Sequence, residues 1–230
     1  MIHKLRPAFK LILKRLVYNS NDLVISQYKH NVIPPEKMSF LIKSLQETNK
    51  VNLKQYSSLI PKKQDKKWFN EWPGEHYKLL VGICKVIKPK LVIEIGTWRG
   101  LGSLALSIHA KSVITYDILR IDKIPNSIIN LCMERKNITQ IIGDLSIINF
   151  YSKEVEKIRM ADIVFIDGPK NYTFEKIMIA RLLSDMKKGS LLIIDDIRFA
   201  NMLSIWEGIK NAKIDLADFG HVSGTGVVFI

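Results

Sequence analysis

The stretch 91-LVIEIGTWRGLGSLALS-107 is the strongest indication of the fold, because it joins an apolar run to a helical pattern through a glycine-rich turn. The run carries one acid, Glu94, and the turn contains Gly96 and Gly100. Glycines in such a turn let the backbone approach a ligand closely, with the amides of the following helix behind it. The dinucleotide fingerprint G-x-G-x-x-G does not fit, since the register is E-x-G-x-x-x-G. The turn therefore predicts a nucleotide site with a different spacing.

Apolar runs and helical patterns alternate along the chain on both sides of this turn. The runs are continuous, which favours parallel strands buried on both faces; they lie at 91–95, 112–117, 138–142, 161–166 and 190–194. Helices are predicted at 75–87, 101–110, 126–135, 147–158, 172–187 and 200–210. Residues 212–230 read as two strands joined by a Gly/Ser-rich turn, an antiparallel hairpin. The pattern predicts an α/β fold: a Rossmann-like, doubly wound, mostly parallel sheet with helices on both faces.

The length and composition suit one large domain with an appendage. The chain has 230 residues, of which 47% are hydrophobic, enough for a full core. Cys84 and Cys132 lie in apolar helical patterns, so buried free thiols are expected rather than a disulfide. No Cys/His cluster has the spacing of a zinc site. These features indicate a reducing, cytoplasmic compartment.

The charge is concentrated in the first third of the chain. Residues 1–70 hold 14 Lys/Arg and 4 Asp/Glu, whereas residues 71–230 hold 21 and 18. We expect residues 1–70 to form a basic, mostly helical extension, with a helix at 35–48 and a Lys-rich linker at 61–68. Residues 71–230 would form the main domain. The basic segment suggests an anionic partner, membrane lipid or nucleic acid, or else a solvated surface.

Residues 1–18 have the pattern of a basic amphipathic helix. Leu5, Phe9, Ile12 and Leu16 share one face. A helix of this kind has two possible roles. It lies on an anionic bilayer surface, which would make the protein peripheral at the membrane, or it packs on its own domain or on a second subunit. Lipid contact and self-association are thus both open, and nucleic acid is not expected as a partner. No run of eighteen apolar residues occurs, so no membrane-spanning helix is predicted.

Each of the five predicted parallel strands ends in or near an acidic residue. These residues are Glu94, Asp117, Asp144 after Gly143, Asp167, and the pair Asp195 and Asp196. Ligands of open α/β sheets bind at the carboxyl ends of the strands, and an acid ending the second strand bonds ribose hydroxyls. A single Asp after a strand is often only a cap or turn residue. Five successive strand-end acids indicate a site.

This pattern resembles the class I S-adenosylmethionine-dependent methyltransferases over about residues 71–230. The features that carry the resemblance are E-x-G-x-x-x-G, the acid ending the next strand, the following Gly-Asp, and the terminal hairpin. The resemblance implies S-adenosylmethionine as cofactor. Its binding residues would be Glu94, Gly96, Thr97, Gly100, Ser103, Asp117, Gly143 and Asp144.

Two further segments, 161-ADIVFIDGPKNY-172 and 189-GSLLIIDDI-197, look like the catechol-type, metal-dependent O-methyltransferases. That resemblance implies Asp167, Asp195 and Asp196 as metal ligands. Lys170 would be the general base, with Asp167 beside it as the second catalytic residue. Oxygen ligands suit Mg²⁺ or another oxygen-preferring divalent cation, and a cation would lower the pKa of Lys170. The alternative is a metal-free site in which Asp196 caps a helix and Asp167 belongs to the cofactor pocket.

The chain departs from the family at two positions. Gly102 stands where the family has Ser or Thr, so Ser103 would have to supply the hydroxyl. Asp196 stands where catechol-type enzymes often have Asn. On the substrate side, His76, Tyr77, His221, Trp98 and Trp206 are further candidates, each also explained as a packed or surface residue.

The predicted function is O-methylation of a small-molecule or sugar hydroxyl by direct displacement. One alternative is an NAD-dependent oxidoreductase, which the spacing of Gly96 and Gly100 and the terminal hairpin disfavour. The other is a non-catalytic binding protein whose basic N-terminal segment engages membrane or RNA. The set of strand-end acids disfavours that alternative.

Overall fold

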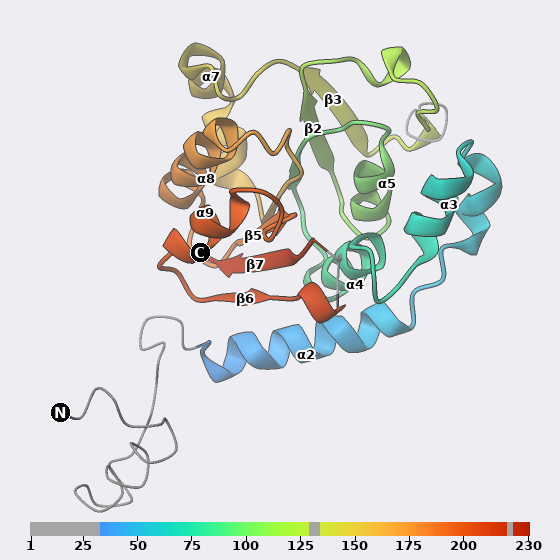
Figure 1. Cartoon of the computed structure of the whole chain (residues 1–230), viewed down its shortest axis with the longest axis horizontal. Coiled ribbons are helices and arrows are strands. Elements are labelled where there is room, and N and C mark those ends of the chain that lie inside the picture. Colours follow the sequence, from blue (N-terminus) through green and yellow to red (C-terminus); the bar gives the residue numbers. More distant parts are fainter. Residues whose placement is uncertain (1–32, 129–133, 220–222) are drawn as a thin grey trace, which may run out of the picture. The chain divides into compact units, whose positions relative to one another are not determined.

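A computed structural model describes residues 33–128, 134–219 and 223–230. Within these ranges one mixed sheet has seven strands in the order β3-β2-β1-β4-β5-β7-β6 (Figure 1). The strands are β1 (Val92–Ile95), β2 (Val113–Asp117), β3 (Ile138–Ile142), β4 (Ile163–Ile166), β5 (Leu191–Asp195), β6 (Lys213–Asp215) and β7 (Thr225–Phe229). β1 to β5 are parallel, and β7 pairs antiparallel with both β5 and β6. The predicted doubly wound sheet with a terminal antiparallel pair is confirmed.

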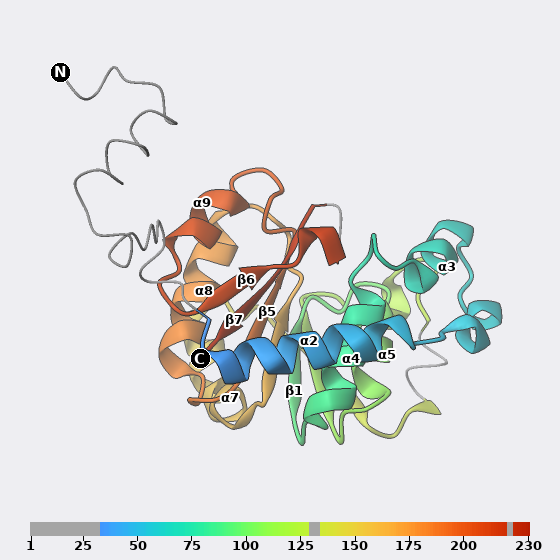
Figure 2. The same cartoon turned by 90° about the horizontal axis from the view of Figure 1, so that it is seen from below.

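Helices lie on both faces of the sheet, as predicted. They are α2 (Pro35–Asn49), α3 (Lys63–Asn70), α4 (Tyr77–Ile87), α5 (Leu101–Ser107), α7 (Ile148–Met160), α8 (Thr173–Asp185) and α9 (Met202–Gly208). Short 3₁₀ helices occur at η3 (Lys54–Leu59), η4 (Ile121–Lys123) and η5 (Ala217–Phe219). In Figures 1 and 2, α2, α4 and α5 lie on one face, and α7, α8 and α9 lie on the other.

Alternation along the strands divides the core into two layers. In β5, Leu191 and Ile193 pack with α4 and α5, whereas Leu192 and Ile194 pack with α7, α8 and α9. Successive side chains of a strand point to opposite faces, so every second residue belongs to the same layer. The same alternation places Asp167, just after β4, and Asp195, the last residue of β5, on the α4 side of the sheet.

Residues 33–70 belong to the same compact unit as the sheet, which extends from Ile33 to Ile230. Helix α2 lies against α4 so closely that a Cβ atom on Gly82 would be 2.1 Å from Thr48 Oγ1. The helix predicted at 35–48 is confirmed. The linker predicted at 61–68 is wrong, because residues 63–70 form α3. Phe69 and Asp65 are buried there, so tertiary contacts hold a Lys-rich segment in a helix.

Some predictions lie outside the described residues: the amphipathic helix at 1–18, Cys132, His221 and half of the helix at 126–135. Cys84 is a buried free thiol, as expected, and burial raises its pKa to about 12. Across the described ranges, no helix combines the length and apolar character needed to cross a membrane.

Candidate active site

The turn after β1 is a strained loop held by the end of the next strand. Gly96 and Gly100 have φ values of 105° and 90°, and Trp98, between them, has a φ of 43°. The Asp117 carboxylate accepts the backbone N–H of Thr97 at 3.0 Å and of Trp98 at 2.9 Å. Such positive-φ residues persist only where their surroundings fix them, and they gather at functional sites. Asp117 is therefore part of the structure that shapes the turn.

A cavity of about 670 Å³ opens at the carboxyl ends of β1, β2, β3 and β4. Five residues predicted from the sequence line it: Gly96, Asp117, Gly143, Asp144 and Asp167. Trp98 also lines it and is 58% exposed, whereas Trp206 is buried in the core. This volume suits a small-molecule ligand, since such pockets measure about 300–1,000 Å³.

Four other predicted residues, Glu94, Thr97, Gly100 and Ser103, do not line this cavity in the described part of the chain. Glu94 is buried and accepts a hydrogen bond from the Ser103 hydroxyl. The hydroxyls of Thr97 and Thr115 bond each other at 2.7 Å. Together these groups form a buried polar layer beneath the turn.

The same layer explains why glycine occupies position 102. A Cβ atom there would lie 2.2 Å from Glu94 Oε1, so the serine or threonine expected from the family would displace the carboxyl group. The hydroxyl of Ser103, predicted to replace the missing one, donates to Glu94 in this structure. The departure at Gly102 is thus a packing requirement of buried Glu94.

Replacing Glu94 with glutamine is expected to change how stability depends on pH. Burial raises the pKa of Glu94 from 4.5 to about 8, so the folded state holds this proton more tightly than the unfolded chain. The associated stabilisation is complete below pH 4.5 and is lost as the pH rises through about 8. Glutamine does not titrate. Urea denaturation should therefore show the variant gaining free energy of unfolding, relative to wild type, across that window.

The control for this experiment is Ser103→Ala. It removes a hydrogen bond that lowers the pKa of Glu94, so the loss of stability should extend to higher pH. Parallel stability profiles for wild type and Glu94→Gln would show that Glu94 does not titrate in this range.

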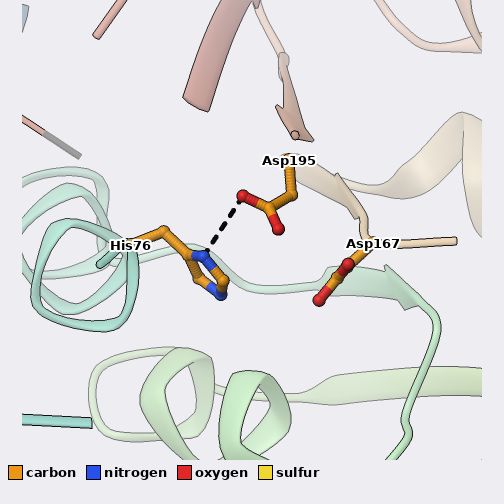
Figure 3. A group of neighbouring side chains, drawn as sticks. All are labelled: His76, Asp167 and Asp195. Carbon is orange, nitrogen blue, oxygen red and sulfur yellow. Dashed lines mark ion pairs between the residues drawn. The ribbon is translucent and has the colours of Figure 1, made fainter. Parts of the chain in front are cut away.

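A cluster of ionisable side chains adjoins the cavity at the ends of β4 and β5. His76, Asp167 and Asp195 each place one donor atom within 4.8 Å of the others (Figure 3). His76 and Asp195 are both 3% exposed, and Nδ1 of His76 lies 3.2 Å from Oδ1 of Asp195. Burial by itself lowers the pKa of His76, but Asp195, Asp167 and Glu75 raise it to about 9. Asp167 belongs to both the cluster and the cavity wall.

Lys170 neutralises part of this negative charge. Its Nζ atom lies 2.6 Å from Asp167 Oδ1 and 3.3 Å from Asp196 Oδ2. Burial by itself lowers the pKa of Lys170, but the carboxylates of Asp167, Asp195 and Asp196 raise it above its ordinary value. A lowered pKa, which a base requires, would need a cation that offsets these carboxylates.

The loop that carries Lys170 is fixed by Glu175, a residue not predicted from the sequence. Lys170 and Tyr172 have φ values of 57° and 71°. Buried Glu175 accepts the backbone N–H of Lys170 at 2.7 Å and of Tyr172 at 3.0 Å. An acid at the third position of a helix is the capping-box signal, and it could have identified Glu175 from the start of α8.

No protein-family model matches the sequence, and no curated protein matches it. Solved structures share its fold. A methyltransferase from Podospora anserina, solved with SAH bound, is 12% identical with a TM-score of 0.52, and the match covers 86% of this chain and 89% of that one. The O-methyltransferase from Bacillus cereus in complex with SAH is 14% identical with a TM-score of 0.51, covering 95% and 97%.

A methyltransferase from Geobacter sulfurreducens is 14% identical with a TM-score of 0.50, covering 86% of this chain and 91% of that one. At these identities the likeness concerns the fold alone. The described part of this chain therefore has the fold of the class I S-adenosylmethionine-dependent methyltransferases that its sequence motifs resemble.

Proposed function

We propose that this protein is an S-adenosylmethionine-dependent methyltransferase acting on a hydroxyl of a small molecule or sugar. The observation that carries the proposal is the position of Asp167, which lines the cavity and also belongs to the cluster with His76, Asp195 and Lys170. The cofactor would thus bind in the cavity directly beside ionisable side chains that are able to accept the proton of the acceptor hydroxyl.

The residues at the cavity fit the cofactor. Asp117 is suited to ribose hydroxyls and Asp144 to an adenine amino group, while Gly96 and Gly143 leave room for backbone approach. When bound, S-adenosylmethionine supplies an electrophilic methyl group on its sulfonium. The half-exposed Asp167 faces the same cavity, so the acceptor would enter beside it.

The donor set also fits a divalent cation. Asp167 and Asp195 offer oxygen atoms close together, where two carboxylates repel unless charge is neutralised. These two residues would hold the cation, which when bound would lower the pKa of the acceptor hydroxyl and of Lys170. Mg²⁺ is the cation suggested by the family resemblance.

The residues of the chain then handle one proton. In the transfer, the acceptor oxygen would bond to the methyl carbon as the bond from that carbon to sulfur breaks, and the hydroxyl proton would pass to Lys170 Nζ in its neutral form. Asp167 Oδ1, at 2.6 Å, holds the resulting ammonium in place. Glu175 fixes the backbone on which Lys170 stands. S-Adenosylhomocysteine and the methyl ether are the products.

Calorimetric titration with S-adenosylhomocysteine, with and without Mg²⁺, tests this proposal. Binding at one site per chain is expected, and the same titration with NAD⁺ should give no heat of binding. Binding of NAD⁺ instead would favour an oxidoreductase. A non-catalytic protein would be indicated if S-adenosylhomocysteine does not bind and no methyl transfer from labelled S-adenosylmethionine is detected with a panel of hydroxyl acceptors.

The variant Asp117→Ala is expected to weaken binding of S-adenosylhomocysteine by at least about tenfold. It removes an acceptor for ribose hydroxyls together with two hydrogen bonds to the turn, each worth about 1 kcal/mol or more. Asp122→Ala is the matched control, because Asp122 is a nearby acid that pairs with Arg120 on the surface. Unchanged affinity in Asp117→Ala would refute the assignment of Asp117 to the cofactor.

A further inference from the structure

We propose that His76, Asp167 and Asp195 are the protein ligands of the divalent cation, that Asp196 is not a ligand, and that the site prefers Mn²⁺ or Co²⁺ to Mg²⁺. This inference rests on the proposed function and makes it specific. It replaces one carboxylate of the ligand set implied by the family resemblance with an imidazole nitrogen.

The sheet brings the two acids together. Phe165 of β4 is in register with Ile193 of β5, and both belong to the layer that packs with α4 and α5. Two residues further along each strand, Asp167 and Asp195 follow on the same face because side chains alternate. The two carboxylates therefore stand side by side, as Figure 3 shows.

His76 completes this group from the α4 side. It directly precedes α4, and its ring packs against Tyr77 and Phe165 with centroid distances of 4.3 and 5.4 Å. These contacts hold the ring over the two acids. Its Nδ1 atom lies 3.2 Å from Asp195 Oδ1. Donor atoms on neighbouring positions of an octahedral ion are about 3 Å apart when each lies about 2.1 Å from the metal.

Asp196 is directed to other partners. It has a φ of 56°, and its Oδ1 atom accepts a hydrogen bond from the Ser223 hydroxyl. Its Oδ2 atom lies 3.3 Å from the Lys170 ammonium. Lys170 also pairs with Asp167, so what sets Asp196 apart among the described residues is its bond to Ser223 and its position outside the group of His76, Asp167 and Asp195. Asp196 is suited to hold Lys170 beside the site, whereas His76 faces the two acids.

The ligand set determines which cation binds best. Carboxylates alone suit Mg²⁺ and Ca²⁺, whereas an imidazole favours first-row transition metals. One nitrogen and two carboxylate donors, of which His76 and Asp195 are buried and Asp167 is open to the cavity, should bind Mn²⁺ at least about tenfold more tightly than Mg²⁺. Co²⁺ should bind more tightly again, in the Irving–Williams order.

The test is performed on the full chain with Mn²⁺ alone as the probe. Calorimetry gives the affinities for Mn²⁺ and Mg²⁺, and pulsed electron paramagnetic resonance detects a nitrogen nucleus bonded to Mn²⁺. The wild-type protein should show nitrogen coupling. This measurement requires no variant, so it remains decisive if a substitution impairs folding. Binding of Mn²⁺ without nitrogen coupling overturns the proposal.

Three variants test whether the nitrogen nucleus coupled to Mn²⁺ belongs to His76. His76→Phe keeps the aromatic packing but removes the donor, so it should abolish the coupling and weaken Mn²⁺ binding at least about tenfold. His109→Phe changes an exposed histidine outside the cluster and should leave both unchanged. Asp196→Gly removes the carboxylate while accepting the positive φ, and should retain the coupling. Loss of Mn²⁺ binding in Asp196→Gly but not in His76→Phe would overturn the assignment.

Failure of the proposed metal ligands and failure of the proposed methyltransferase function give different binding results. If S-adenosylhomocysteine binds but neither metal does, the ligand set is refuted and the methyltransferase proposal stands. If Mn²⁺ binds with nitrogen coupling but S-adenosylhomocysteine does not, the metal site stands and the proposed function is refuted.

Discussion

Replacing Gly96 with alanine is expected to destabilise the protein far more than the same change at Gly189. Both glycines have positive φ values, 105° and 86°, so alanine is strained at either position, at a cost of about 1–2 kcal/mol. A Cβ atom at Gly96 would also lie 2.0 Å from the carbonyl oxygen of Asp167, whereas nothing lies within 4 Å of one at Gly189. Gly189→Ala is therefore the matched control for backbone strain.

The additional cost at Gly96 comes from overpacking against a backbone that cannot move freely. The Asp167 N–H donates to Ile95 O at 2.8 Å, so the ends of β1 and β4 are joined at this point. Inserting a methyl group into such a site costs about 1–3 kcal/mol beyond the strain. Urea denaturation of the two variants and wild type measures the difference. Equal losses at the two positions would show that the strand ends separate without cost.

The same substitution should also weaken ligand binding. Relieving the contact requires the Asp167 backbone to shift, and Asp167 lines the cavity as well as the cluster with His76 and Asp195. Gly96→Ala should therefore weaken both S-adenosylhomocysteine and Mn²⁺ binding, while Gly189→Ala should change neither. Calorimetry on the folded fraction of each variant provides this measurement.

The fold and one wall of the site were predictable because they depend on local sequence. Strand patterns and the strand–turn–helix junction depend on the residue types within short segments of sequence. The observed bounds of β1 to β5 therefore differ from the predicted ones by two residues at most. Gly96, Asp117 and Asp144 line the cavity because strand ends of a parallel sheet converge at one edge.

The remaining features depend on partners far away in the sequence. A Lys-rich segment reads as a solvated linker, yet α3 buries Asp65 against Arg99, 34 residues later. The role of Glu94 beneath the turn follows from the packing of Gly102 and Ser103 against it. His76 meets Asp195 only through the tertiary fold. Periodicity carries no information on such pairings, which is why the linker prediction failed.

Replacing Arg99 with methionine is expected to lower the free energy of unfolding strongly, because Arg99 joins the glycine-rich turn to α3. Arg99 Nη1 donates to both carboxylate oxygens of Asp65, at 3.1 and 3.0 Å, and Asp65 is 1% exposed. Arg99 Nε also donates to Pro125 O at 3.2 Å. Removing the guanidinium leaves a buried carboxylate without its counter-charge. Breaking a buried ion pair in this way costs about 3–5 kcal/mol of unfolding free energy.

A double-mutant cycle separates the pair from the packing of the arginine side chain. In Asp65→Asn with Arg99→Met, no charge is left buried, so the double variant should be more stable than Arg99→Met alone. Arg120→Met is the control, because Arg120 makes a similar two-bond pair with Asp122 on the surface, and exposed pairs contribute little. Comparable losses in Arg99→Met and Arg120→Met would show that burial does not strengthen the pair.

The effect should extend to cofactor binding, because Arg99 lies within the turn whose backbone N–H groups at Thr97 and Trp98 are held by Asp117. Without Arg99, α3 no longer holds the turn, and the positive φ values of Trp98 and Gly100 lose one of their constraints. Arg99→Met should therefore weaken S-adenosylhomocysteine binding although no atom of Arg99 lines the cavity. If affinity stays at the wild-type value while stability falls, α3 supports the core alone, and the turn depends on Asp117 for its shape.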